Sequence, residues 1–165
     1  MITKNYYVAR RTYDTNTTST TSVNTTPYTV KSLLGTEYHS IKASLTQGRV
    51  LWNTSNLEVH LGTGTKAEAP DDYCLDNDIT ATLTGVTFNV QTTVSIEMSR
   101  YCYKSIITIS FNNSTGAAVD ITEVGLSANW IFTGDSNMLI FRKLINPVHV
   151  ENNQSTTIVL NWFDF

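Results

Sequence analysis

The chain has 165 residues, a formal net charge of −3 and only 15% charged residues, where a soluble domain usually carries roughly 25%. This length suits one well-filled core, and the net negative charge argues against a nucleic-acid-binding protein. Threonine, asparagine and serine replace the missing charged residues. Neutral polar groups cost less to desolvate than charges, and interface cores show the same depletion of charge. The composition therefore favours a chain that packs against other subunits over a monomer with a neutral surface.

The N-terminal region has two unusual features. It is mildly basic and rich in tyrosine, with Lys4, Arg10 and Arg11 among Tyr6, Tyr7 and Tyr13, a pattern that fits an edge strand better than a nucleic-acid-binding arm. Residues 14–26 then form a Thr/Ser/Asn tract that cannot bury enough apolar surface to order itself. We predict that residues 1–30 form an extended arm that serves as an assembly segment, and that residues 31–165 form a single β-sandwich domain.

Targeting signals are missing from the expected places. No apolar run follows Met1, so we expect no secretory signal, and no segment has the length of a transmembrane helix. We therefore expect synthesis in a cytoplasm and no membrane insertion. Cys74 and Cys102 do not form a CxxC pair, so no zinc site is expected, and whether the two cysteines pair stays open.

From residue 31 onward the chain is organised as alternating segments separated by turn signals. Leu57, Val59 and Leu61 alternate with polar residues, the segment 107–111 repeats the pattern, and the segment 157–163 closes the chain. We predict an all-β fold, a sandwich of mainly antiparallel short strands of jelly-roll or immunoglobulin-like type. The residues expected in its core are Ile107, Ile109, Phe111, Ile121, Ile158, Leu160 and Trp162.

A long loop between residues 62 and 78 contains two motifs that need an interpretation. Gly62-Thr63-Gly64 is half of a nucleotide-binding fingerprint but lacks the third glycine and the helix, so we expect the glycines to allow a sharp exit from the preceding strand, with a positive φ at one of them. The only acidic cluster consists of Asp71, Asp72, Asp76 and Asp78. Carboxylates at these spacings suit Ca²⁺, but the EF-hand pattern fails, and a turn or capping role is favoured.

No motif for catalysis is present. His39, His60 and His149 are far apart in the sequence, and HExxH, GxSxG and Cys–His signatures are missing. An enzyme would need one of these histidines to meet an acid in a pocket. We predict no catalytic, cofactor-binding or metal-binding residues, no cofactor and no enzymatic activity.

Three segments in a fixed order resemble a loose group of small bacteriophage structural proteins. The group shares a "GTG…P…DY.L" loop, an "I.I.F.N…I.EVGL" strand pair and an "L..R" strand that leads to "P..V". The matching segments here are 61–65 with 70–75, 107–113 with 121–126, and 139–143 with 147–150. The resemblance covers about residues 57–163. Cys74, where an aliphatic residue or alanine is more usual, and Lys143 after Arg142 depart from the pattern.

The resemblance implies a non-enzymatic component of a virion, which assembles with copies of itself and with other virion proteins. It leaves open whether the place is tail, neck, head decoration or fibre, and it brings no catalytic residues. From the net negative charge we expect no direct contact with nucleic acid. The alternative is a carbohydrate- or receptor-binding sandwich on a phage tail or fibre, which exposed side chains at Trp52, Trp130 or Tyr73 would favour.

One pair within these motifs has a physical rationale of its own. Glu123 lies inside an otherwise apolar strand, and a half-buried carboxylate needs a partner. Arg142, on the strand after the next turn, is the next cation along the chain. We predict that the two pair across neighbouring strands, the alternative being that both face water. Gly125 indicates a bulge or a close approach of another segment.

Overall fold

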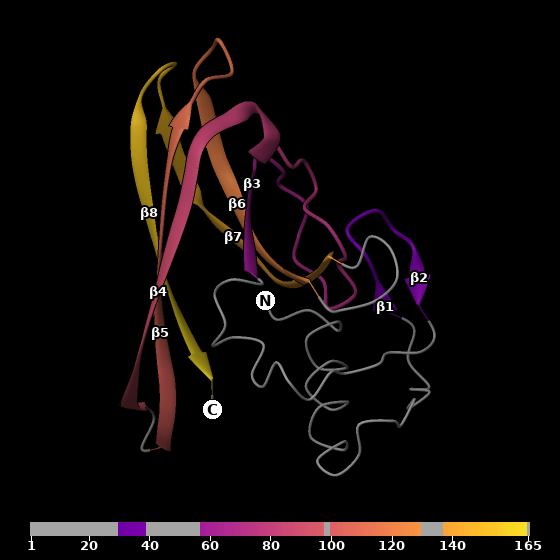
Figure 1. The fold of residues 1–165 in the computed structure, drawn as a ribbon, viewed down its shortest axis with the longest axis vertical. Coiled ribbons are helices and arrows are strands. Elements are labelled where there is room, and N and C mark those ends of the chain that lie inside the picture. Colours follow the sequence, from indigo (N-terminus) through magenta and orange to yellow (C-terminus); the bar gives the residue numbers. More distant parts are fainter. Residues whose placement is uncertain (1–29, 39–56, 98–99, 130–136, 165) are drawn as a thin grey trace. The chain divides into compact units, whose positions relative to one another are not determined.

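The computed structural model describes residues 30–38, 57–97, 100–129 and 137–164 (Figure 1). These residues are almost entirely β-structure, and none of them forms an α-helix. No described helix is both long enough and apolar enough to cross a membrane. The strands are β1 (Val30–Lys31), β2 (Glu37–Tyr38), β3 (Leu57–Gly62), β4 (Leu83–Glu97), β5 (Arg100–Asn113), β6 (Val119–Asn129), β7 (Asn137–Val150) and β8 (Ser155–Asp164), with a 3₁₀ turn, η3 (Thr80–Thr82), before β4.

The chain divides into two compact units. The first comprises Met1–Ile79 and Ile121–Val148, and the second comprises Thr80–Asp120 and His149–Phe165. Among the described strands, one three-stranded sheet has the order β3-β6-β7, another has the order β4-β5-β8, and β1 pairs with β2. The pairs β1–β2, β3–β6, β4–β5 and β5–β8 are all antiparallel. The prediction of an all-β fold with two antiparallel sheets, the β-sandwich class, is confirmed.

In the first unit, the central strand β6 is buried along most of its length. β3 pairs with it in continuous register from Leu57 opposite Ala128 to Gly62 opposite Glu123. On β3 the alternate residues Leu57, Val59 and Leu61 are buried, whereas every residue of β6 from 123 to 128 is buried. A central strand covered on both faces offers no water to a charged side chain, so Glu123 has to find its partners within the protein.

In the second unit, the sheet β4-β5-β8 has one apolar face and one mainly polar face. Ile107, Ile109 and Phe111 alternate on β5 and are 0–2% exposed, and Ile158 on β8 is also buried. With Ile121 of the first unit, these confirm five of the predicted core residues. Leu160 is only partly buried, and the side chain of Trp162 lies outside the described residues.

The strands are longer than the sequence indicated. The segments on either side of Gly85 form a single 15-residue strand, β4, because a register shift between Thr84 and Thr87 absorbs the irregularity. Gly85 has a φ of 60°, which glycine adopts without the steric cost that a side chain brings. An isolated glycine inside a strand pattern is typical of such a bulge.

Several predictions concern residues outside the described ranges. They include most of the N-terminal arm, the Thr/Ser/Asn tract 14–26, His39, Trp52, Trp130 and the side chain of Cys102. The arm and the single-domain boundary at residue 31 stay predictions. Cys74 has a free thiol.

Candidate functional site

A buried ion cluster lies at the centre of the first unit. Glu123 on β6 is 0% exposed and Arg142 on β7 is 1% exposed. Arg142 Nε donates to Glu123 Oε2 at 3.0 Å, and Nη2 lies 2.9 Å from the same oxygen. The predicted Glu123–Arg142 pair between neighbouring strands is therefore confirmed, and it is fully buried.

Asp72 is a third member of this cluster, which sequence reasoning had placed only in a turn. Its side chain accepts a hydrogen bond from the backbone N–H of Ala69 at 2.8 Å, as a turn residue would. The same oxygen, Oδ2, accepts from Arg142 Nη1 at 2.7 Å. The turn interpretation was correct but incomplete, because no spacing in the sequence connects Asp72 with a strand 70 residues away.

Arg142 uses all three of its nitrogens. Besides the two carboxylates, it donates to the backbone carbonyls of Lys66 at 3.0 Å and Ala67 at 3.4 Å. Burial alone would lower the pKa of Arg142, but hydrogen bonds to Asp72 and Glu123 outweigh it and raise the pKa above its ordinary value. The guanidinium stays charged, and its planar fork matches the two carboxylates and the loop carbonyls.

Glu123 binds the backbone of the long loop between residues 62 and 78. Its carboxylate accepts hydrogen bonds from the backbone N–H groups of Gly64 at 3.0 Å, Asp76 at 3.1 Å and Asn77 at 2.8 Å. With Arg142, these donors satisfy a carboxylate that has no access to water. Hydrogen bonds to a charged acceptor are stronger than those between neutral groups, so this one side chain fastens both ends of the loop.

The two glycines of the loop are required by close approach and not by a left-handed backbone. A Cβ at Gly62 would clash with Glu123 Oε1 and with the carbonyl oxygen of Asn77. A Cβ at Gly64 would clash with the same carboxylate and with Asp76. The described glycines with positive φ are Gly35, Gly85 and Gly116, so the expectation of a positive φ at Gly62 or Gly64 was wrong.

Gly125, in contrast, follows the predicted alternative of a close approach. A Cβ there would lie 2.9 Å from Leu139 Cδ1 and from Leu75 Cδ2. Its register with His60 is unbroken, so it does not mark a bulge. The side chain of Leu75, from the loop, packs against β6 in the space that the glycine leaves.

The segment 63–78 is a closed loop whose two ends pair with each other. Thr63 N donates to Asn77 O at 3.0 Å, and Ile79 N donates to Leu61 O at 2.9 Å. A compact surface loop with adjacent ends that is packed by its own residues is an Ω-loop. We call residues 63–78 the Ω-loop. The hydrogen bonds that hold this loop in place come from its own chain.

Asp72, Asp76 and Asp78 of the Ω-loop each bind a different partner. Asp72 faces Arg142, whereas Asp76 Oδ2 accepts from the backbone N–H groups of Thr65 and Lys66, both at 3.3 Å. Asp78 lies beside His60. Within the described residues, no group of three or more His, Cys, Asp or Glu side chains is arranged to hold a metal ion.

Both histidines that the structure describes, His60 and His149, meet acids, as an enzyme would require. His60 Nδ1 lies 2.9 Å from Asp78 Oδ2 and Nε2 lies 2.8 Å from Ser127 Oγ, the order of contacts found in a serine-hydrolase triad. However, Ser127 is 0% exposed, so a substrate cannot reach its hydroxyl. The arrangement satisfies polar groups across β3 and β6.

The second histidine site is at the surface. His149 Nδ1 lies 2.7 Å from Asp120 Oδ1, and Nε2 lies 3.3 Å from Glu151 Oε1. The hydrogen bond to Asp120, and then that to Glu151, raises the pKa of His149 above its ordinary value. Both ring nitrogens donate when the ring is protonated, so this cluster favours an imidazolium and leaves no free nitrogen for general-base catalysis.

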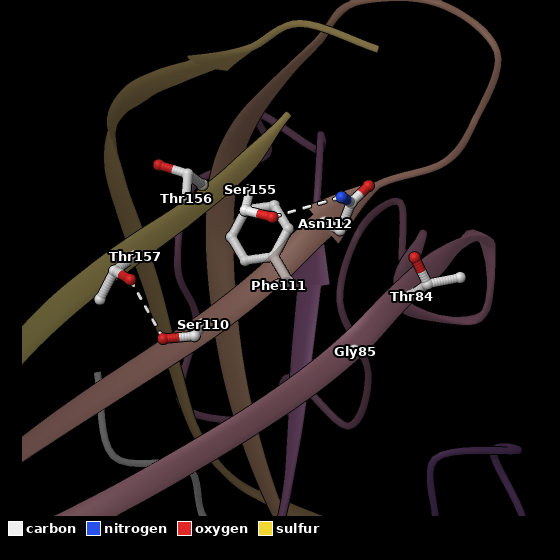
Figure 2. A pocket seen from close by; sticks show the side chains of 8 residues that line it. All are labelled: Thr84, Gly85, Ser110, Phe111, Asn112, Ser155, Thr156 and Thr157. Atoms are coloured by element: carbon white, nitrogen blue, oxygen red, sulfur yellow. Dashed lines mark hydrogen bonds between the residues drawn. The ribbon is translucent and has the colours of Figure 1, made fainter. Parts of the chain in front are cut away.

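A shallow hollow of about 270 Å³ lies on the sheet of the second unit (Figure 2). Its lining is neutral and consists of Thr84, Gly85, Ser110, Phe111, Asn112, Ser155, Thr156 and Thr157. Ser110 Oγ lies 3.0 Å from Thr157 Oγ1, and Asn112 Nδ2 donates to Ser155 Oγ at 3.3 Å (Figure 2). Hydroxyl and amide groups can hydrogen-bond neutral polar ligands, but the lining holds no acid, base or cation.

Tyr73 is the one described residue among the three aromatic candidates for sugar stacking. Its side chain is partly buried, and the Lys31 ammonium lies 5.4 Å from the ring centroid. Gly35 packs against the same ring, since a Cβ there would lie 3.5 Å from Cε2. The β1–β2 hairpin therefore already occupies part of the ring surface that a sugar would use.

Comparison of the chain with protein-family models, with curated proteins and with solved structures finds no match.

Proposed function

We propose that the protein is a non-enzymatic structural component of a bacteriophage virion, which assembles with copies of itself and with other virion proteins. The observation that carries this proposal is where the motif residues lie. Each of the three segments that resemble phage structural proteins contributes a part, from the Ω-loop, β6 or β7, to one buried cluster. Gly64 and Asp72 come from the first segment, Glu123 from the second and Arg142 from the third.

The nature of this cluster favours a structural role for the motif. Its charged side chains are 0–9% exposed, and each one binds another member of the cluster or the backbone of the Ω-loop. A motif that served catalysis would present at least one reactive group to a substrate. A motif that serves a scaffold fixes a loop on a sheet, and this is what these residues do.

The composition supports assembly. A 15-residue strand with no charged residue before its last position, β4, is unusual on a protein that must stay monomeric. Desolvating such a surface against a neighbour costs little.

The test is whether the chain is part of the particle. Particles of the phage that encodes the chain are purified by density-gradient centrifugation and probed with an antibody raised against the recombinant protein. We expect a fixed number of copies per particle by quantitative mass spectrometry and a discrete location by immunogold labelling. Its presence in infected cells together with its absence from purified particles would overturn the proposal.

A carbohydrate-binding module is the alternative, and the neutral hollow on β4, β5 and β8 is the observation in its favour. Glycan-array binding that is lost in a Ser110→Ala/Asn112→Ala variant would support it. The hollow has Phe111 as its only aromatic lining residue, and that residue is 2% exposed, which leaves little ring surface for a sugar to stack on.

A further inference from the structure

The four outer strands of the two three-stranded sheets differ in how they are protected from pairing with another chain. β3 carries Glu58 and His60, and its end is closed by the Gly62–Asp78 bridge. β7 carries Lys143 and Pro147, and its Leu144 N–H is bonded to Glu68 Oε1 at 2.9 Å. Charged residues, proline and a covering loop are the usual means of blocking an edge strand.

β4 lacks these devices over most of its length. It runs for 15 residues, and from Leu83 to Ile96 it contains neither a charged residue nor a proline. Its one irregularity, the bulge between Thr84 and Thr87, lies at one end. Among the described strands β4 pairs only with β5, at one side of the sheet β4-β5-β8.

The side chains along β4 agree with an open edge. The residues of its polar face, Thr87, Asn89, Gln91 and Thr93, are all exposed. Val94 is 67% exposed, one of the most exposed large apolar residues that the structure describes. β8, at the other side of the sheet, is also largely neutral, but it has ten residues and reaches Asp164.

We infer that the β4 edge is a homotypic interface, at which β4 of a second copy pairs antiparallel with it about a two-fold axis. This inference rests on the proposed function, because it assigns the contact between copies that an assembling protein needs. Strand addition at an edge gains its affinity from main-chain hydrogen bonds, and a two-fold axis presents the same strand from both sides. The contact would join two three-stranded sheets into one of six strands.

The polar face of β4 suits this pairing because it is complementary to itself. With Val90 on the two-fold axis, Asn89 faces Gln91 of the second copy, and Thr87 faces Thr93. Hydroxyl and carboxamide groups both donate and accept hydrogen bonds, and Thr–Thr pairs across antiparallel strands are favourable. No like charges meet between residues 83 and 96. A charged residue near the middle of such an edge would lie close to the same charge on the second copy, because the two-fold axis brings the same strand of both copies together.

The test uses charge at the two central exposed positions. We expect the full-length protein to have the mass of a dimer, or of a multiple of dimers, by light scattering after size exclusion. Asn89→Lys/Gln91→Lys places lysines opposite lysines and should weaken association at least about tenfold. Asn89→Lys/Gln91→Glu places each lysine opposite a glutamate and should restore it. The matched control on the other edge, Val159→Lys/Asn161→Lys, should associate as the unmodified protein does.

Thermal unfolding of each variant shows whether it is folded, since all four positions are exposed. Equal masses for all variants, or a monomeric unmodified protein, would overturn the inference. The inference would also be overturned if the β8 control variant alone dissociated. It would likewise be overturned if the double-lysine variants of β4 and of β8 both dissociated, because that result indicates head-to-tail pairing of β4 with β8. The antibody test on particles is a separate experiment. If the chain is found in particles but its β4 variants have the same mass as the unmodified protein, the virion proposal stands and the β4 interface is ruled out.

Discussion

Gly64 and Glu123 lie 59 residues apart, yet the Gly64 N–H donates to Glu123 Oε1 at 3.0 Å, and any side chain at Gly64 would overlap that oxygen. The backbone of the Ω-loop thus reaches a buried carboxylate only because residue 64 has no Cβ. The same contact explains a second glycine, Gly62, whose Cβ would meet the same carboxylate. The Gly-Thr-Gly sequence resembles a fragment of a nucleotide-binding loop, but here its two glycines leave space for the carboxylate of Glu123 in the protein's own sheet.

This contact predicts the effect of Gly64→Ala. The added methyl group forces Glu123 or the Ω-loop to move, and overpacking of this kind costs typically about 1–3 kcal/mol. We expect a loss of that size in the free energy of unfolding in urea. Gly85→Asn is the control, because a Cβ at Gly85 meets nothing within 4 Å and asparagine tolerates its positive φ. A Gly64→Ala variant as stable as the unmodified protein would contradict the assigned role of this glycine.

The Glu123–Arg142 pair predicts strong coupling between two substitutions. Removing one member of a buried ion pair leaves an uncompensated charge, which costs about 3–5 kcal/mol. We expect losses of this order for Glu123→Gln and for Arg142→Met, and a smaller loss for the double variant than for the sum of the two. A double-mutant cycle in urea measures the coupling. Independent, additive losses would show that the two charges do not stabilise each other.

Asp72 allows the hold on the Ω-loop to be tested locally. Asp72→Asn keeps the size of the side chain but removes the charge that Arg142 Nη1 binds at 2.7 Å. We expect faster hydrogen exchange at amides 64–77, with unchanged exchange in β5. Asp71→Asn, at an exposed neighbouring position, is the matched control. Equal exchange in both variants would mean that the loop is held by Glu123 alone.

Much of the fold follows from residue patterns, and the limits of these patterns are physical. Alternation placed Ile107, Ile109 and Phe111 on one face because a strand has a period of two. The Glu123–Arg142 pair followed from one carboxylate in an apolar strand. Asp72 was missed as an ion partner because its contact with Arg142 depends on where the Ω-loop folds back. The only available signal was the coincidence of two closely spaced glycines with a buried glutamate, which indicates that something must approach closely.

Cys74 should react slowly with alkylating reagents. Burial raises the pKa of its thiol, and the nearby carboxylate of Asp72 adds to the rise. Because the thiolate is the reactive form, we expect slower modification of Cys74 by iodoacetamide at pH 8 than in the urea-unfolded chain, measured by mass spectrometry of the peptide that contains it. Equal rates in the folded and the unfolded protein would contradict the partial burial of this thiol.

His149 should titrate above its ordinary pKa of 6.5, because its protonated ring bonds Asp120 and then Glu151. A folded pKa above the unfolded one means that the imidazolium stabilises the fold at pH values below the unfolded pKa. The contribution then declines as the pH rises through the folded pKa. The side chains are exposed, so the effect on stability is small, and the titration itself is the better measurement.

An NMR titration of the His149 ring should give a pKa above 6.5. This pKa should fall in Asp120→Asn and fall less in Glu151→Gln, since the bond to Asp120 is the shorter one. A His149 pKa that is the same in all three proteins would show that these carboxylates do not bind the ring in solution.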